Sequence, residues 1–159
     1  MKYSRLTKEQ FDEMHQEFIN FLATQSITAK EWEAIKSENP EAAEQELDVF
    51  SDLIWQGVLQ KIKYLENISP QQMFLFHIED NQIRVIVIKI EKPQVDITTK
   101  EGYHWLKSNL FDESVKLFNG KKPYSDDKLM DRFNLIQQGA IITKGELFQF
   151  FDQLLKSSI

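Results

Sequence analysis

A chain of 159 residues that is 42% hydrophobic and 12% aromatic is long enough to bury a core, and we expect a single domain over residues 1–159. The chain has no cysteine, which excludes disulfides, thiolate catalysis and cysteine-based zinc sites. The net charge is −6, and residues 1–70 hold the whole excess of acid, with 7 Lys and Arg against 13 Asp and Glu, so a broad basic face for nucleic acid is not expected.

Capping signals predict three helices in the N-terminal half of the chain. Thr7–Gln10 and Thr28–Glu31 have the form of capping boxes, and Asn39-Pro40 sets an N-cap residue before a proline. We expect a helix over 8–23, a short second helix, and a long helix over 40–65. Apolar residues cover more than half the circumference of the long helix, which predicts contacts on more than one side.

Gly57 lies inside the predicted long helix. A glycine in a helix interior costs about 1 kcal/mol relative to alanine. We therefore expect another backbone or a large ring to approach the helix closely at this position.

Residues 73–90 are the most informative stretch for the fold. Two apolar segments rich in β-branched and aromatic residues flank a polar tetrad with Asp80 and Asn81 at its centre. These two residue types tolerate the backbone of a tight turn, so the pattern predicts an antiparallel β-hairpin. The expected facing pairs are Ile78 with Ile83, His77 with Arg84, Phe76 with Val85, Leu75 with Ile86, Phe74 with Val87, and Met73 with Ile88. Both faces are largely apolar, so we expect both to be covered.

The remaining segments predict a third short strand and further helices. Val95–Ile97 follows a proline and is the candidate third strand. Helices are expected near 100–110, 112–118 and 126–138, and a capping box at Thr143–Glu146 opens a last helix with a Phe/Leu face. The predicted fold class is α+β: a mostly helical single domain packed on one central antiparallel hairpin of two or three strands. A helical bundle that bears the hairpin as an arm is the alternative.

His15 lies in the apolar stripe of the first predicted helix, where a buried imidazole is either a general base or metal ligand, or a hydrogen-bonded core residue. Asp12–His15 and Glu101–His104 both have the acid-x-x-His spacing that carboxylate-bridged di-metal bundles use. One alternative function is therefore a small metalloprotein or enzyme. Its candidate residues are His15, Glu44, Asp48 and His104.

An acidic stripe on the long helix consists of Glu41, Glu44, Asp48 and Asp52, spaced three and four apart. It predicts either a site for a cation or a basic partner, or a solvated face whose first-turn acids favour the helix dipole.

His77 and Arg84 face each other near the predicted hairpin turn, with Glu79 close by. They form either an anion or acid–base site or a polar rim at the end of the sheet. The Phe/Leu face of the last helix is either core or a surface for a partner helix or a second copy.

Several familiar machineries are absent from the sequence. The five glycines form no phosphate-binding loop of the Walker or dinucleotide type, and no nucleophile elbow or His-Glu-x-x-His motif occurs. The N-terminal residues do not form a secretory signal, and no apolar run is long enough to cross a membrane. We expect a cytoplasmic protein without a cofactor, and we favour a protein that is not an enzyme.

Four stretches carry a resemblance to a known family: Leu-Thr-Lys-Glu-Gln-Phe (6–11), Phe-Ile-Asn-Phe-Leu-Ala-Thr-Gln-Ser-Ile (18–27), Glu-Leu-Asp-Val-Phe-Ser-Asp-Leu-Ile-Trp (46–55) and Gln-Met-Phe-Leu-Phe-His (72–77). Together they resemble a family of short, uncharacterised bacterial proteins classed as a domain of unknown function. The resemblance implies a bacterial cytosolic protein and brings no activity, ligand or site residue.

The leading functional hypothesis is a non-enzymatic module that binds another protein or associates with itself, for example as a homodimer. We expect neither nucleic acid nor a membrane as its partner. Its basis is the lack of catalytic motifs, the aromatic supply and the two apolar hairpin faces. The alternatives are the metalloprotein described above and a small-molecule binder with an aromatic-lined pocket among the helices.

Overall fold

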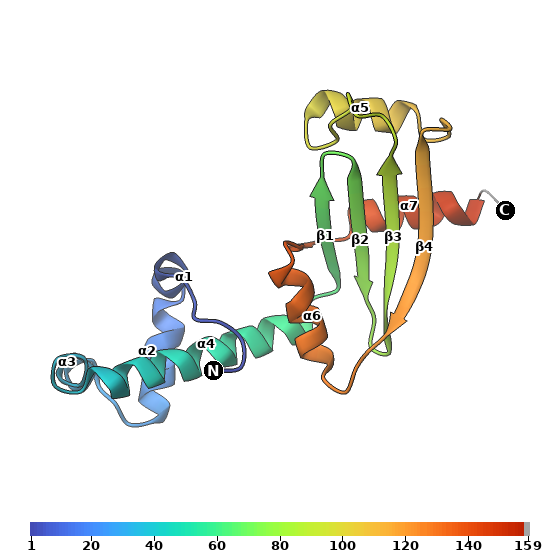
Figure 1. Ribbon diagram of the computed structural model, residues 1–159. Helices are drawn as coiled ribbons and strands as arrows, with labels where there is room; N and C mark the ends of the chain where they lie inside the picture. The colour runs from blue at the N-terminus through green and yellow to red at the C-terminus, as the bar shows by residue number, and fades with distance from the viewer. Residues whose placement is uncertain (158–159) are drawn as a thin grey trace. The chain divides into compact units, whose positions relative to one another are not determined.

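The computed structural model describes residues 1–157, which form seven helices and a five-stranded antiparallel sheet (Figure 1). The chain divides into two compact units, Met1–Gln60 and Lys61–Ile159. The α+β class is confirmed, whereas the predicted sheet of two or three strands was wrong because the sheet has five. That both units fold as one cooperative domain stays a prediction, which a single coincident unfolding transition would support.

The first unit is helical. Its helices are α1 (Lys8–Glu13), α2 (His15–Thr24), α3 (Ala29–Glu38) and α4 (Pro40–Lys61). Thr7 forms the expected capping box with Gln10, and the Thr28 hydroxyl accepts the Glu31 N–H. The predicted first helix is broken in two at Met14, whose N–H donates to both the Gln10 and Phe11 carbonyls in a tightened turn.

Aromatic rings fill the core of the helical unit. Phe18 lies at its centre, and the centroids of four further rings lie 5.0 to 6.2 Å from that of Phe18. These rings belong to Phe11, Phe21, Trp32 and Phe50. Aromatic pairs of this kind add about 0.5–1.5 kcal/mol each beyond the area that they bury, so all four phenylalanines of this unit contribute to one aromatic core.

The second unit is built on the sheet. Its strands are β1 (Tyr64–Ser69), β2 (Gln72–Ile78), β3 (Gln82–Ile90), β4 (Val115–Pro123) and β5 (Ile141–Thr143), in the order β4-β3-β2-β1-β5. The predicted hairpin is β2 and β3, and all six predicted residue pairs are confirmed. The turn is closed by the Glu79 N–H, which donates to the Gln82 carbonyl at 3.0 Å.

Two strands replace segments that were predicted as helix, and one predicted strand does not form. The long helix ends at Lys61, not at residue 65, because Tyr64 and Leu65 pair with both β2 and β5. The predicted helix over 112–118 was wrong, because β3 offers a β-branched edge along which β4 pairs over its whole length. The predicted strand at Val95–Ile97 was also wrong: this segment joins two turns, and its apolar side chains enter the core without strand pairing.

Helices cover the two faces of the sheet unequally. On one face, α5 (Lys100–Ser108) and α7 (Glu146–Ser157) enclose Met73, Leu75, Ile86 and Ile88, which are fully buried. The opposite face carries α6 (Lys128–Gln137), whose Leu135 lines a hollow together with Phe76 and Val85 of the sheet. In Figure 1, α7 passes behind the sheet. The expectation that both faces are covered therefore holds fully for one face and only in part for the other.

Candidate functional site

The histidines of the predicted metal site are exposed. His15 begins α2 and is open to solvent, so the expectation of a buried imidazole was wrong; Phe18 and Leu22 are the side chains that α2 buries. His104 is exposed on α5 in the second unit. Within residues 1–157, no three His, Asp or Glu side chains lie close enough to one another to hold a metal ion.

The acidic stripe of α4 binds the N-terminal segment of its own chain. Arg5 donates through Nε to Asp48 Oδ1 at 2.7 Å, and its Nη1 lies 2.7 Å from Glu44 Oε2. Asp52 accepts the backbone N–H groups of Lys2 and Tyr3 at 2.6 and 2.9 Å. Most of the stripe is thus neither an open cation site nor simply a solvated face. The basic group that it binds lies 43 positions earlier in the sequence, at the N-terminal end of the same unit.

Arg84, in the predicted polar group near the hairpin turn, is paired with a carboxylate of the same chain. It donates from Nη2 to Asp152 Oδ1 of α7 at 2.7 Å and from Nη1 to Oδ2 at 3.3 Å. These hydrogen bonds raise the pKa of Arg84 and lower that of Asp152. The His77 ring stacks on that of Tyr64, with centroids 4.6 Å apart. The group therefore fastens α7 to the sheet, and Arg84 is already bound to an internal anion.

Removal of the Asp152 carboxylate tests this fastening. Because the pKa of Asp152 is lowered in the folded state, the carboxylate stabilises the fold above the ordinary aspartate pKa, and that contribution is lost as the pH falls through the folded-state pKa. We expect Asp152→Asn to lower the free energy of unfolding by about 1–2 kcal/mol at neutral pH and to weaken its dependence on pH between about 5 and 2. Urea denaturation across this range measures both, with Asp126→Asn as the exposed control.

Within the second unit, no helix or strand covers one region of the sheet on the face that carries α6. Phe74, Val87 and Phe118 are paired in register across β2, β3 and β4, so their side chains form one row on that face. Phe118 is 54% exposed, and the other two are partly exposed. The next row toward one end of the strands holds Lys89 and Lys116, which are paired and both exposed. We call these five residues the β3–β4 surface.

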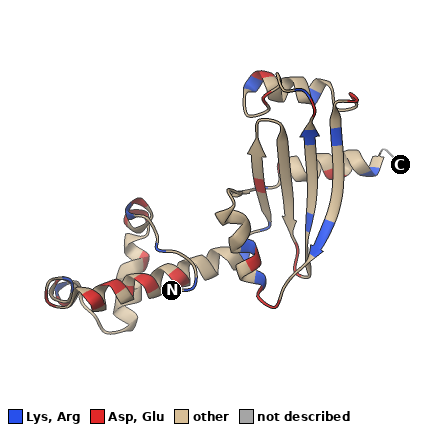
Figure 2. Cartoon of the chain, in the orientation of Figure 1, with Lys and Arg blue, Asp and Glu red and all other residues tan. Residues whose placement is uncertain are grey.

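The outer edge of β4 adjoins this surface. Within residues 1–157, no strand pairs with that edge, so its N–H and C=O groups face outward. Besides Lys116, the strand carries exposed Lys121 and Lys122 and ends at Pro123. Basic residues on β3 and β4 lie toward the strand ends, with uncharged residues between them (Figure 2).

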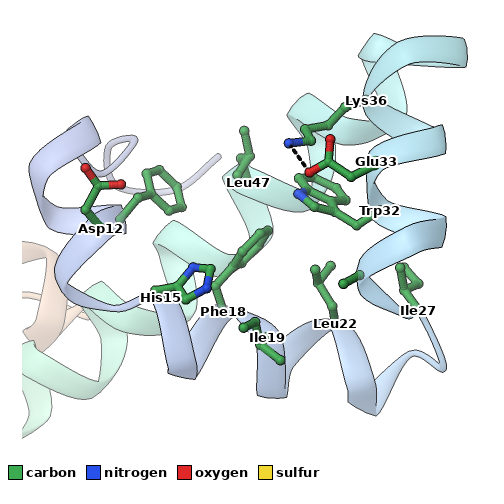
Figure 3. Close-up of a pocket in the computed structure, with 12 residues that line it drawn as sticks. Asp12, His15, Phe18, Ile19, Leu22, Ile27, Trp32, Glu33, Lys36 and Leu47 are labelled. Atoms are coloured by element: carbon green, nitrogen blue, oxygen red, sulfur yellow. Dashed lines mark ion pairs between the residues drawn. The ribbon is translucent and has the colours of Figure 1, made fainter.

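A second candidate site is a pocket inside the helical unit, with a volume of about 420 Å³ (Figure 3). Its walls are apolar and in part aromatic, and its polar groups lie at two ends. Asp12 and His15 lie at one end, and Glu33 and Lys36, whose charged groups are 2.8 Å apart, lie at the other. The walls comprise Phe11, Phe18, Ile19, Leu22, Ile27, Ala29, Trp32 and Leu47. The predicted aromatic-lined pocket thus has a counterpart in the structure.

Comparison with known proteins gives a family and no activity. The chain belongs to the family of unknown function DUF6495, whose model matches residues 1–156. The resemblance to a domain of unknown function is thereby confirmed. No curated protein and no solved structure matches the chain. Among the described residues, no helix combines the length and the apolar character that crossing a membrane requires.

Proposed function

We propose that this protein is a non-enzymatic interaction module that binds an extended acidic segment of a partner protein on the β3–β4 surface and along the β4 edge. The observation that carries the proposal is the apolar row that α6 leaves open, with Phe118 54% exposed at its end. A large ring in such a position loses contact with water when a partner covers it, and aromatic residues are frequent anchors of protein interfaces.

The shape of the site favours an extended partner. A strand added to the free edge of β4 would satisfy its outward N–H and C=O groups. Alternate side chains of that strand would then lie beside Phe118. A hollow of about 230 Å³, lined in part by Phe76, Val85 and Leu135, lies between α6 and the sheet on the same face and offers room for one such side chain.

The charge of the site favours an acidic partner over a second copy of the chain. If β4 paired antiparallel with itself about Asn119, Lys116 would face Lys122 of the other copy, and like charges in direct opposition are destabilising. A strand that alternates acidic and apolar residues would instead set carboxylates beside these lysines. Of the two partners predicted from the sequence, we therefore propose a different protein and a monomeric free state.

The test uses a short peptide that alternates glutamate with valine, titrated into the full chain and followed by amide NMR. We expect shifts of β4 amides, and we expect the charge reversals Lys116→Glu and Lys122→Glu together to weaken binding about tenfold. The matched control is Lys100→Glu with Lys144→Glu, which reverses two exposed lysines elsewhere in the same unit and should leave binding unchanged.

Three results would overturn the proposal. The first is the absence of any chemical-shift change in the β4 amides on addition of the peptide. The second is equal weakening of peptide binding by the control pair of substitutions. The third is tighter binding of a single-stranded oligothymidylate than of the peptide, which would assign the row that ends at Phe118 to base stacking. Light scattering adds an independent check, because it measures the oligomeric state. A dimer that dissociates when Phe118→Ser is introduced would reassign the surface to self-association.

A further inference from the structure

We infer that the pocket of the helical unit binds a small organic cation with an apolar body, such as an arylalkyl amine. The inference is independent of the proposed partner surface, because the pocket and its residues all lie within Met1–Gln60. The volume of about 420 Å³ falls within the range of pockets that hold small ligands.

The walls select the body of the ligand. The pocket lies between α1 and α2 on one side and α3 and α4 on the other, and the side chains of Leu22 and Trp32 form part of its lining (Figure 3). Ile19 lines the pocket and is 39% exposed. Filling the pocket would bury this side chain, and an apolar or aromatic body is the filling that gains free energy from doing so.

The rim selects the charge of the ligand. The carboxylate of Glu33 is paired with Lys36, and Lys36 also lies 5.9 Å from the centroid of the Trp32 ring, so this end of the pocket is internally neutralised. Asp12, at the other end, has no ion pair or hydrogen bond through its side chain within residues 1–157. The free charge on the rim is therefore negative, and the same pocket is lined by aromatic rings, which attract cations.

The charge of the whole unit acts in the same direction. Residues 1–60 contain 5 Lys and Arg against 12 Asp and Glu, so their net charge is −7. Such a unit attracts small cations and repels anions. A fatty acid or another apolar anion would fit the walls of the pocket, but it would meet the wrong charge at the rim.

The experiment compares three probes that share a phenyl ring and differ in charge: phenethylamine, phenethyl alcohol and hydrocinnamate. Each is titrated into the full chain, and the indole N–H signal of Trp32 is followed by NMR. We expect phenethylamine to bind more tightly than the alcohol and hydrocinnamate to bind least. Asp12→Asn should weaken phenethylamine binding about threefold to fivefold and leave the alcohol unchanged.

Two further variants make the result decisive. Glu13→Gln removes the same charge from the adjacent exposed position, which does not line the pocket, and it should leave all three probes unaffected. Ile19→Trp fills the pocket and should abolish binding of both phenethylamine and the alcohol. The inference is overturned if no probe shifts the Trp32 signal, if the anion binds as well as the cation, or if Glu13→Gln acts like Asp12→Asn.

Discussion

Replacing Phe151 by alanine should lower the free energy of unfolding by about 3–5 kcal/mol. The Phe151 side chain is 2% exposed and belongs to the core cluster between α7 and the sheet. It lies among residues such as Leu75 and Ile86, which are fully buried. Truncation therefore removes a large apolar side chain and leaves a cavity that rigid strands cannot close. Urea denaturation monitored by circular dichroism measures the loss.

The neighbouring residue supplies the control for this substitution. Phe150 is 44% exposed, and its ring meets that of Phe151 edge to face at 5.1 Å. We expect Phe150→Ala to cost less than about 1 kcal/mol, because nearly half of this residue is already exposed to water. Equal losses for the two variants would mean that α7 does not present Phe151 to the core as described.

Replacing Gly102 by alanine should be destabilising by about 3 kcal/mol or more. A Cβ atom at this position would lie 1.7 Å from the Asp96 carbonyl oxygen and 2.3 Å from its carbon, and both atoms belong to the backbone. The turn is held close by Thr99, whose hydroxyl accepts the Gly102 N–H and donates to the Asp96 carbonyl. In the alanine variant, the first turn of α5 therefore has to move away from the loop that precedes it. This movement also breaks the hydrogen bond by which Thr99 caps the helix.

The same change at Gly57 should have the opposite sign. Apart from its two chain neighbours and the backbone of its own helix, no atom lies within 4 Å of a Cβ built at Gly57, so the expected close approach at this position was wrong. Alanine there gains up to about 1 kcal/mol of helix propensity. Thermal unfolding of Gly102→Ala and Gly57→Ala should thus move in opposite directions. A stabilised Gly102→Ala variant would contradict the packing of α5 on Asp96.

Features set by neighbouring residues could be predicted from the sequence. Asp80 and Asn81 define the hairpin turn, and the turn then fixes the register of every pair from Ile78–Ile83 outward. The caps at Thr7 and Thr28 are likewise local, since each hydroxyl bonds an N–H three residues on. Local chemistry was sufficient for these elements.

Features that depend on distant partners could not be predicted in this way. Tyr64 and Leu65 continue the apolar pattern of a helix, and only pairing with β2 and β5 makes them a strand. Asn119-Gly120 resembles a helix stop, yet Gly120 lies within β4 opposite Val85. With residues 112–118 predicted as helix, the row that ends at Phe118 could not be recognised.

The candidate sites, like the fold, could be predicted only in part from the sequence. The aromatic supply correctly indicated a pocket among the helices, but not the break at Met14 that sets His15 at its rim. The acidic stripe was recognised, while its partner Arg5 was not, because the ion pair joins segments 39 and 43 residues apart. Spacing along one helix shows which charges share a face, and it does not show what will lie against that face.

The attachment of the N-terminal segment to α4 makes the helical unit sensitive to trimming. Loss of residues 1–5 would remove Lys2 and Arg5 and take the net charge of the unit from −7 to −9, with Glu44, Asp48 and Asp52 left to repel one another along one side of a helix. Added salt screens such repulsion. We therefore expect the stability of a unit trimmed of these few residues to rise with ionic strength more steeply than that of the intact unit.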